Sequence, residues 1–364
     1  MEETVDKKFD IIISAVRDEY LSEAQKYPWI IGFSGGKDST LVAHIVFDAL
    51  LSIPPEKRTR MIYIVSNDTL VESPLVVTHM RKIQAAIAEA AKNLKLPLSV
   101  GTTKPVIEQT FWVNLIGRGY PTPNQSMRWC TDRLKIQPTS RFILDFVSQC
   151  GAAIIVLGVR RSESNSRRAS IDKYVNEPGT NLTPHGDLSG AFIYRPISDL
   201  STDDVWEMLA SFTPPWGGTH RDLIKLYRNA EGGECPVVLS KDDAPGCGTN
   251  SSRFGCWTCT VVEKDKSLQG FVDSGLVGYK PLIEFRDWLK EIRNNRDLRQ
   301  AARRNGRVTF TNQGQHIAGP FTIQARRQIL EKLLAVQEEF GEELISDAEI
   351  EVIRRLWTED LTKQ

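Results

Sequence analysis

The segment Ile30-Ile31-Gly32-Phe33-Ser34-Gly35-Gly36-Lys37-Asp38-Ser39-Thr40 runs from apolar residues through a glycine pair into polar ones. The run from Trp29 to Phe33 is typical of a buried parallel strand, and apolar residues recur at helical spacing from Leu41 to Leu50. Adjacent glycines let backbone N–H groups close around an anion, and a helix N-terminus adds positive potential. The segment therefore predicts a strand, a phosphate-binding loop and a helix.

The polar side chains of this loop fit a polyphosphate. Hydroxyl groups can donate hydrogen bonds, Lys37 adds a cation, and Asp38 can hold Mg²⁺ through water. The predicted phosphate-binding residues are Ser34, Gly35, Gly36, Lys37, Asp38 and Ser39. We also expect Lys37 and Asp38 to be catalytic. A glycine-rich turn without a ligand is the alternative, and it fits poorly with so many polar residues between a buried strand and an amphipathic helix.

The loop differs from the Walker phosphate-binding loop, which requires four residues between its glycines. Ser34-Gly-Gly-Lys-Asp-Ser39 instead resembles the SGGxDS loop of ATP pyrophosphatases. Those enzymes cleave ATP between its α and β phosphates and transfer AMP to a substrate oxygen. The resemblance implies that ATP is bound here.

Composition is ordinary for a soluble globular protein. The 364 residues carry 46 basic and 46 acidic side chains, so contact with nucleic acid requires a local patch. No apolar run approaches the roughly 20 residues of a membrane span, and the N-terminus lacks the pattern of a signal peptide. We expect a cytoplasmic protein with no membrane partner. In that compartment its six cysteines favour metal ligands, catalytic thiols or core residues over disulfides.

Apolar strands alternate with helical patterns after a lead-in helix at 7–26. The predicted strands are 29–33, 61–65, 96–100, 153–157 and 192–197. This alternation predicts an α/β fold with a doubly wound, mainly parallel sheet. We expect three regions: an α/β domain at 1–210, a Cys-rich irregular segment at 211–280 and a helical C-terminal region at 281–364.

Polar residues follow two of the predicted strands at the edge where open α/β sheets bind ligands. Ser66 and Asp68 follow the second strand, and we expect them to flank adenosine. Gly158 follows the fourth strand and begins a segment with four arginines. From that segment we expect Arg160 or Arg167 to balance the charge that develops on pyrophosphate.

The cysteines suggest a metal centre. Cys256 and Cys259 form a CxxC pair, which redox dithiols, zinc sites and iron–sulfur sites all use. A zinc site would be expected to show a second close pair, and a thioredoxin-type dithiol should open a helix after a strand. We therefore favour a [4Fe–4S] cluster. The predicted ligands are Cys130, Cys247, Cys256 and Cys259; Cys235 is a candidate persulfide carrier or structural residue, and Cys150 a core residue.

The loop, the segment Gly158–Ser164 and the cysteine pattern together resemble the phosphoadenosine-phosphosulfate reductase superfamily, in which a segment like Gly158–Ser164 helps to bind the nucleotide. A closer resemblance, to DNA phosphorothioation proteins of the DndC and SspD kind, rests on five further segments. These are Thr110–Gly117, Arg128–Thr131, Pro215–Gly218, Leu226–Ala230 and Arg253–Thr260.

That resemblance implies an adenine nucleotide alpha hydrolase-like fold and an ATP pyrophosphatase that carries a [4Fe–4S] cluster. It implies action on DNA, where sulfur replaces a non-bridging phosphate oxygen. The implied partners are DNA, a cysteine desulfurase as sulfur donor and other DNA phosphorothioation proteins. The four predicted cluster cysteines match the ligand positions of these relatives.

A basic stretch offers one route to DNA. Residues 286–307 contain eight basic and three acidic side chains, a net charge of +5. A solvated helix face is an equally good interpretation. The five histidines are scattered, and none is assigned a catalytic role; Trp112, Trp129, Trp216 and Trp257 are expected to pack in the core.

Three other functions compete with this interpretation. A sulfonucleotide reductase would share the fold, but it commonly depends on a C-terminal cysteine, and no cysteine follows Cys259. A tRNA thiolase of the same loop family would adenylate a base instead of a phosphate. A nucleotide-sensing scaffold would bind ATP without turnover, so pyrophosphate release separates it from the enzymes.

Overall fold

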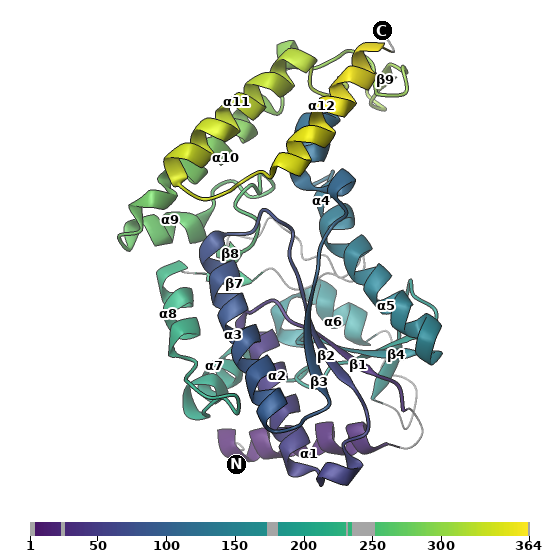
Figure 1. Cartoon of the computed structure of the whole chain (residues 1–364), viewed down its shortest axis with the longest axis vertical. Coiled ribbons are helices and arrows are strands. Elements are labelled where there is room, and N and C mark those ends of the chain that lie inside the picture. The colour runs from purple at the N-terminus through teal and green to yellow at the C-terminus, as the bar shows by residue number, and fades with distance from the viewer. Residues whose placement is uncertain (1–3, 23–25, 173–180, 231, 235–251, 363–364) are drawn as a thin grey trace.

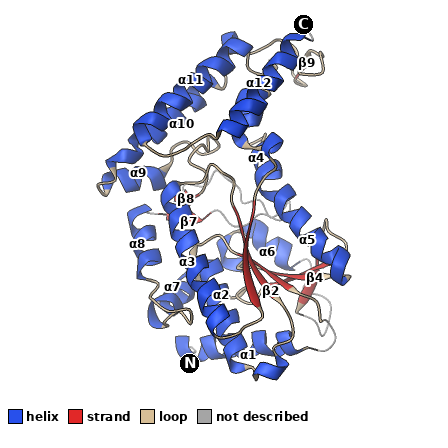
Figure 2. Ribbon diagram, viewed as in Figure 1, coloured by secondary structure: helices blue, strands red, loops and turns tan. Residues whose placement is uncertain are grey.

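The computed structural model describes residues 4–22, 26–172, 181–230, 232–234 and 252–362. Figure 1 shows an α/β body built around one sheet and a helical part that lies over one edge of this body. Figure 2 shows that the strands are concentrated in the body, while long helices make up most of the other part.

The central sheet has six strands in the order β3-β2-β1-β4-β6-β5. The strands are β1 Trp29–Gly32, β2 Ile62–Asn67, β3 Leu98–Thr103, β4 Ala153–Val156, β5 Leu182–Pro184 and β6 Ala191–Tyr194. All neighbours are parallel except β5, which pairs antiparallel with β6. The predicted doubly wound, mainly parallel sheet is confirmed. Its strand order reverses between β1 and β4, where such sheets bind ligands.

The sheet is surrounded by helices and continues into the helical part. The α-helices are α1 Val5–Leu21, α2 Lys37–Ser52, α3 Pro74–Asn93, α4 Trp129–Thr131, α5 Gln137–Cys150, α6 Asn165–Asp172, α7 Thr202–Ser211, α8 Arg221–Ala230, α9 Lys266–Asp273, α10 Lys280–Ile292, α11 Ile323–Phe340 and α12 Asp347–Thr362. Shorter elements are η1 Pro55–Lys57, η2 Ile107–Gln109, η3 Val113–Gly117, η4 Asp132–Ile136, η5 Arg161–Glu163, η6 Val277–Tyr279, η7 Arg296–Leu298, β7 Gly232–Glu234, β8 Ser252–Phe254, β9 Thr309–Phe310 and β10 His316–Ile317. No helix in the described part of the chain is both long and apolar enough to span a membrane.

Two hydrophobic clusters cover the two faces of the sheet. The larger one includes buried side chains of α1, α2 and α7 and continues into α10, α11 and α12. The smaller one joins Ile30, Val65 and Ile155 of the sheet to Ile143 of α5. Because one cluster spans both parts of the molecule, burial of apolar surface holds the helical part against the α/β body.

The start of α7 follows the sequence closely. The Ser201 hydroxyl accepts a hydrogen bond from the backbone N–H of Asp204, and the Asp204 carboxylate accepts one from the backbone N–H of Ser201. This reciprocal pair satisfies two donors that would otherwise lack intrahelical partners. The sequence Ser201-Thr202-Asp203-Asp204 predicts such a helix cap, and the structure confirms it.

Within the predicted irregular segment at 211–280, the Gly-, Pro-, Cys- and Trp-rich composition of 213–260 indicates little regular structure, and this prediction is wrong for α8. Its Leu223, Leu226 and Tyr227 are buried at helical spacing. Charged residues between them gave the segment a polar composition, and composition outweighed periodicity in the prediction. The part that contains Cys235 and Cys247 lies outside the described residues.

The helical part is fastened to the chain that follows β3. Trp112 donates from its indole nitrogen to the Leu344 carbonyl at 2.6 Å, and Trp357 donates to the Ile116 carbonyl at 2.9 Å. Arg326 donates to the Gly117 carbonyl at 3.0 Å and to the Asp360 carboxylate at 2.7 Å. These bonds bury η3 between α11 and α12, so the edge of the sheet and the helical part form one packed unit.

Two of the histidines meet in the core. His44 Nδ1 lies 3.0 Å from His220 Nε2, and His44 Nε2 lies 3.1 Å from the Asp48 carboxylate. If His44 Nε2 donates to Asp48, its Nδ1 accepts a hydrogen bond from His220 Nε2, so both nitrogens of a neutral His44 ring have partners. Burial, followed by the charges of His44 and His79, lowers the pKa of His220 to about 4.

This contact predicts acid sensitivity. Below pH ~6.5 the unfolded chain protonates His220, whereas the folded chain does so only near pH 4, so the free energy of unfolding decreases over that interval. We expect His220 to account for up to about 3 kcal/mol of the decrease. Urea unfolding at several pH values measures this decrease in wild type, in His220→Gln and in the control His316→Gln. An equal pH dependence in all three proteins contradicts the assignment.

Candidate functional site

The phosphate loop connects β1 to α2 as predicted, and Gly36 caps the helix. Gly35 has φ +75°, and a Cβ there would lie 3.1 Å from the Met80 Cβ, so a larger residue would be strained and crowded. The Ser34 and Ser39 hydroxyl oxygens are 3.1 Å apart, and the Ser39 hydroxyl donates to the Gly36 carbonyl at 3.1 Å. These contacts close the loop at the N-terminus of α2, where backbone N–H groups favour anions.

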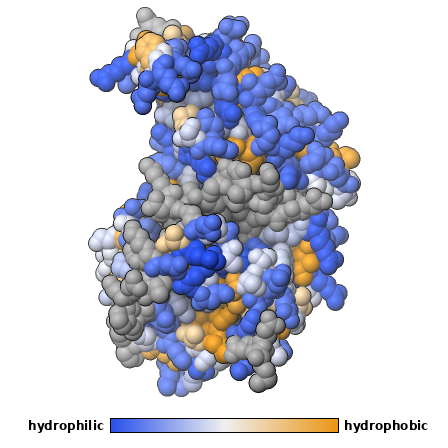
Figure 3. Space-filling view, turned by 180° about the vertical axis from the view of Figure 1, so that it is seen from behind, coloured by the Kyte–Doolittle hydropathy of each residue, from blue (hydrophilic) through white to orange (hydrophobic). Residues whose placement is uncertain are grey.

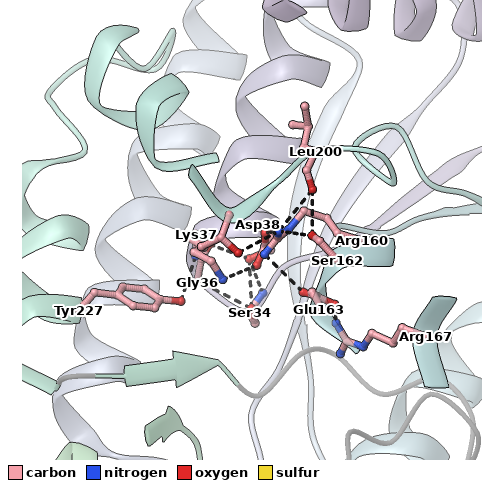
Figure 4. Close-up of polar contacts among 12 residues, drawn as sticks. Ser34, Gly36, Lys37, Asp38, Arg160, Ser162, Glu163, Arg167, Leu200 and Tyr227 are labelled. Carbon is pink, nitrogen blue, oxygen red and sulfur yellow. Dashed lines mark hydrogen bonds and ion pairs between the residues drawn. The ribbon is translucent and has the colours of Figure 1, made fainter. Parts of the chain in front are cut away.

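A buried charge network lies beside the loop (Figure 4). The Asp38 carboxylate accepts a hydrogen bond from Arg160 Nε at 2.5 Å and one from Lys37 Nζ at 2.7 Å. Arg160 is 1% exposed and also donates to the Ser162 hydroxyl at 2.8 Å. The structure therefore brings Lys37, Asp38 and Arg160 together, as expected for residues of one site.

Arg167 reaches this network through an acid. Its guanidinium pairs with the Glu163 carboxylate, whose other oxygen lies 4.0 Å from Arg160. Arg160 thus contacts Asp38 directly, whereas Arg167 contacts Glu163, which lies between Arg167 and Arg160 (Figure 4). Because two cations already hold the Asp38 carboxylate, this arrangement does not fit Asp38 as a direct ligand of Mg²⁺.

Gly158 touches the loop through its backbone. A Cβ on this residue would lie 2.9 Å from both the carbonyl carbon and the carbonyl oxygen of Asp38, and 3.1 Å from the Ser39 nitrogen. Only glycine allows the end of β4 to come this close to the start of α2. Gly158 therefore sets the distance between Arg160 and the phosphate loop.

Ser66 and Asp68 lie at the carboxyl end of β2, as predicted, and both are buried. The Ser66 hydroxyl accepts a hydrogen bond from Gln84 Nε2 at 2.9 Å. The Asp68 carboxylate accepts the backbone N–H of Leu70 at 2.9 Å and lies 3.5 Å from the Arg81 guanidinium. These contacts fix the loop after β2 beside the phosphate loop.

Tyr227 of α8 is a site residue that the sequence did not single out. Its hydroxyl accepts a hydrogen bond from the backbone N–H of Lys37 at 3.2 Å, and Lys37 Nζ lies 5.8 Å from the centre of its ring. Trp206 and Phe254 hold the ring edge-on at centroid distances of 4.8 and 4.6 Å. The phenol oxygen of Tyr227 therefore occupies the backbone N–H of Lys37, at the N-terminus of α2, to which a phosphate oxygen would otherwise bind (Figure 4).

Replacing Tyr227 by Phe is expected to strengthen ATP binding. Without the hydroxyl, the Lys37 N–H loses an uncharged partner that a phosphate must displace, and one such hydrogen bond is worth about 0.5–1.5 kcal/mol. We expect the Kd for ATP to fall about two- to tenfold in calorimetric titration. Tyr279→Phe, which alters a tyrosine of the helical part, is the control. A Kd equal to or above that of the control contradicts the prediction.

The CxxC turn lies against the loop that follows β2. Glu72 and Cys256 form an antiparallel bridge, and Trp257 donates its backbone N–H to the Val71 carbonyl at 3.0 Å. The Thr69 hydroxyl oxygen is 3.4 Å from Cys256 Sγ. The loop that joins β2 to α3 therefore contacts the cysteine turn.

Ionisable groups surround Cys256. Burial raises the pKa of its thiol well above the usual value; Glu72 and Cys130 add to this effect, while Lys135 opposes it. Burial also raises the pKa of Glu72, although Lys135 Nζ lies 3.7 Å from its carboxylate. Lys135 was not predicted as a site residue. Its position five residues after Cys130 was the available signal, but only the fold shows that it reaches Glu72.

The other cysteines have different outcomes. Cys259 donates its backbone N–H to the Cys256 carbonyl at 3.0 Å, so the CxxC pair forms one turn. Cys150, predicted in the core, is exposed because α5 ends there at the surface. Cys247, a predicted ligand, lies outside the described residues. Among the described residues, no three His, Cys, Asp or Glu side chains come close enough to hold one metal ion.

Aromatic rings pack behind the cysteine turn. Trp112 lies 5.8 Å from Trp257 and 4.9 Å from Phe111, whose ring stacks on Trp129 at 5.4 Å. Trp216 lies instead against Phe47 and His44. The expected core packing is confirmed for Trp112 and Trp257, whereas Trp129 and Trp216 are partly buried and pack against the core.

Much of the basic stretch at 286–307 is not a free cationic surface. Arg286 is fully buried and donates to the carbonyl groups of Cys259 at 2.8 Å and Glu263 at 2.9 Å, and also to that of Val262. Arg293 donates to the Thr260 carbonyl at 3.0 Å. Guanidinium groups carry several donors in one plane, so here they fasten irregular backbone.

A family model described as the phosphoadenosine phosphosulfate reductase domain matches residues 28–262. Among solved structures, NAD⁺ synthetase from Burkholderia pseudomallei is 11% identical with a TM-score of 0.37, covering 93% of this chain and 91% of that chain. U34-tRNA thiolase NcsA from Methanococcus maripaludis, with its [4Fe-4S] cluster, is 12% identical with a TM-score of 0.34, covering 78% and 80%.

FMN adenylyltransferase from Candida glabrata, in complex with FMN and the ATP analogue AMPCPP, is 10% identical with a TM-score of 0.35. The match covers 59% of this chain and 60% of the adenylyltransferase chain. At these TM-scores the likenesses carry no functional argument. No curated protein matches the sequence.

Proposed function

This chain belongs to the phosphoadenosine phosphosulfate reductase domain family, and from that premise we propose that it is an ATP pyrophosphatase of DNA phosphorothioation. In this proposal ATP activates a DNA backbone phosphate, and sulfur then replaces one of its non-bridging oxygens. The proposed partners are DNA, a cysteine desulfurase and other DNA phosphorothioation proteins.

The observation that carries the ATP part is the closed loop at the N-terminus of α2 with its charge network. Backbone N–H groups and Lys37 supply positive potential for phosphates, and the loop lies at the point where strand order reverses. Arg160, held by Asp38, keeps a second cation fixed beside the loop. Such preorganised charge stabilises a transition state in which pyrophosphate departs.

The proposed step is adenylation. A DNA phosphate oxygen attacks the α-phosphorus of ATP, the bond to the bridging oxygen breaks, and pyrophosphate leaves with the electron pair. Lys37 and the loop donors hold the departing phosphates. A thiol reductant releases sulfide from the persulfide of the desulfurase and is itself oxidised to a disulfide with the persulfide's inner sulfur. The sulfide then attacks the DNA phosphorus and displaces AMP. The DNA substrate rests on the motif resemblance at 110–131 and 215–260.

The residues around Cys256 are compatible with an iron–sulfur cluster. Each cysteine of a Cys₄ set binds a different iron, so the thiols do not converge on one point as they do at zinc. Cys130, Cys256 and Cys259 would supply three ligands, and Cys247 is the proposed fourth. A bound cluster would hold the cysteine turn together and add a redox-active centre. Lys135 and Thr69 would orient the Cys256 sulfur.

Pyrophosphate release tests the activity. Purified protein is mixed with ATP and either duplex DNA, tRNA or no nucleic acid, and pyrophosphate and AMP are measured. We expect release that depends on duplex DNA and is lost in Lys37→Met, with Lys57→Met as an exposed control on η1. Release stimulated by tRNA would favour a tRNA thiolase, and ATP binding without release would favour a nucleotide sensor.

Iron analysis tests the cluster separately. Anaerobically purified protein should contain about four irons per chain and absorb broadly in the visible range. Cys256→Ala should lose both signals, whereas Cys150→Ala, which alters an exposed cysteine on α5, should retain them. Colourless protein with one zinc contradicts the cluster proposal.

A further inference from the structure

An ordered hairpin extends from the helical part beside the end of α12 (Figure 1). Its strands β9 and β10 pair antiparallel, with Phe310 opposite His316 and Thr309 opposite Ile317. The Thr311 backbone N–H donates to the Gln315 carbonyl at 2.8 Å, and the Thr311 hydroxyl accepts the backbone N–H of Gln315 at 3.1 Å. Residues 307–317, called the hairpin below, thus form a defined two-stranded ribbon.

The hairpin presents apolar surface next to amide side chains. Phe310 is 59% exposed and Val308 is 52% exposed, although both belong to residue types that usually prefer burial. The amides of Asn312, Gln313 and Gln315 occupy the exposed turn. Figure 3 shows the molecule from behind, with a largely hydrophilic helical part and a small hydrophobic patch at its upper end. Phe310 and Val308 together with the amides of the turn offer apolar contact area and hydrogen-bonding groups to a bound molecule.

The surrounding charge is positive. Residues 298–330 contain six arginines and no Asp or Glu. Arg299 and Arg326 are used internally, as their bonds to the Gly319 and Phe321 carbonyls show. Arg304 is also engaged, because it donates to both oxygens of the Asp360 carboxylate, at 3.2 and 3.0 Å, and to the Arg118 carbonyl at 3.0 Å. Arg307 is exposed, and Arg303 is partly exposed beside the hairpin, where its Nε donates to the Thr309 hydroxyl. Although the net charge of the chain is zero, the arginines beside the hairpin form a local site for a polyanion.

We propose that the hairpin binds duplex DNA, with its ribbon in the major groove and Arg303 and Arg307 against phosphates. The B-DNA major groove admits a two-stranded ribbon, and Asn and Gln amides pair well with adenine edges there. The major groove of A-form RNA is too deep and narrow for side chains to read. The inference rests on the proposed DNA substrate and names its binding element.

Fluorescence anisotropy with labelled duplex DNA tests the proposal on the full chain. Arg307→Ala is expected to raise the Kd several-fold and to reduce the slope of log K against log salt by about 1. Phe310→Ala is expected to raise the Kd several-fold without changing that slope, because it removes contact area and no charge. The thermal midpoints of both variants should match wild type, since both side chains are exposed.

Matched controls lie elsewhere on the helical part. Arg354→Ala removes an exposed arginine of α12, and Val277→Ala removes an apolar side chain that is 69% exposed on η6. Hairpin variants that bind duplex DNA as tightly as these controls overturn the inference, and so does an equal loss of tRNA binding. Pyrophosphate release by wild type is measured separately. Hairpin-dependent DNA binding without release would refute the proposed function and leave the inference standing.

Discussion

Replacement of Asp38 by Asn is expected to lower the free energy of unfolding by about 3–5 kcal/mol and to abolish pyrophosphate release. The Arg160 guanidinium is buried and its Nε lies 2.5 Å from the Asp38 carboxylate, so the amide leaves a buried cation without its main counter-charge. Urea unfolding measures the first effect. A coupled pyrophosphate assay measures the second, where a loss of at least about 10²-fold is expected.

A matched control and a second variant separate structural from catalytic effects. Asp203 is exposed and holds the same second position in α7 that Asp38 holds in α2, so Asp203→Asn makes the same change near a helix N-terminus. The double variant Asp38→Asn/Arg160→Met removes the buried cation and should recover most of the stability, but not pyrophosphate release. Recovery of both would show that the pair only stabilises the fold.

Replacement of Arg286 by Met is expected to lower the free energy of unfolding relative to wild type by about 3–5 kcal/mol. The variant leaves the carbonyl groups of Cys259, Val262 and Glu263 without their buried donor. Because these residues continue directly from the CxxC turn, the turn should lose its fixed position. We therefore also expect less iron per chain after anaerobic purification.

Lys290→Met provides the control for Arg286→Met. Lys290 lies one turn further along α10 and forms a salt bridge with the exposed Glu263 carboxylate, so its loss should change the free energy of unfolding little. Urea unfolding and iron analysis are applied to both variants. Equal stability and equal iron content in the two variants would refute the proposed role of Arg286 as the fastening of the cysteine turn.

The phosphate loop and the sheet could be predicted because their signals are local. A run of apolar residues, a glycine pair and a helical repeat lie within about two dozen residues around Gly35, and each pattern has one dominant structural meaning. The same holds for the cap at Ser201. Strand β5 was missed because three residues ending in Pro184 carry no periodicity, and a proline is tolerated only at such an edge.

Site residues were predictable when they belonged to a motif. Ser34, Lys37 and Asp38 fell in the loop, and Arg160 followed a strand whose end faces it. Tyr227 carries no motif that points to the loop, since 190 residues separate it from Lys37. Lys135 likewise reaches Glu72 only through the packing of η4 against the loop after β2. Contacts between distant segments depend on how the elements pack, which periodicity does not encode.

The arginines of 286–307 show the same division. Their number and sign are properties of the sequence, and they predicted a basic surface. Tertiary structure turned Arg286 and Arg293 inward to backbone carbonyls, paired Arg304 with Asp360 and left Arg307 exposed near the hairpin. A guanidinium satisfies buried carbonyls as readily as it meets phosphates, so its neighbours decide its role. The sequence by itself determined the α/β fold and the phosphate loop, because these follow from local patterns. Only the tertiary structure decided which cations hold the protein together and which face a ligand, because that depends on contacts between segments far apart in the chain.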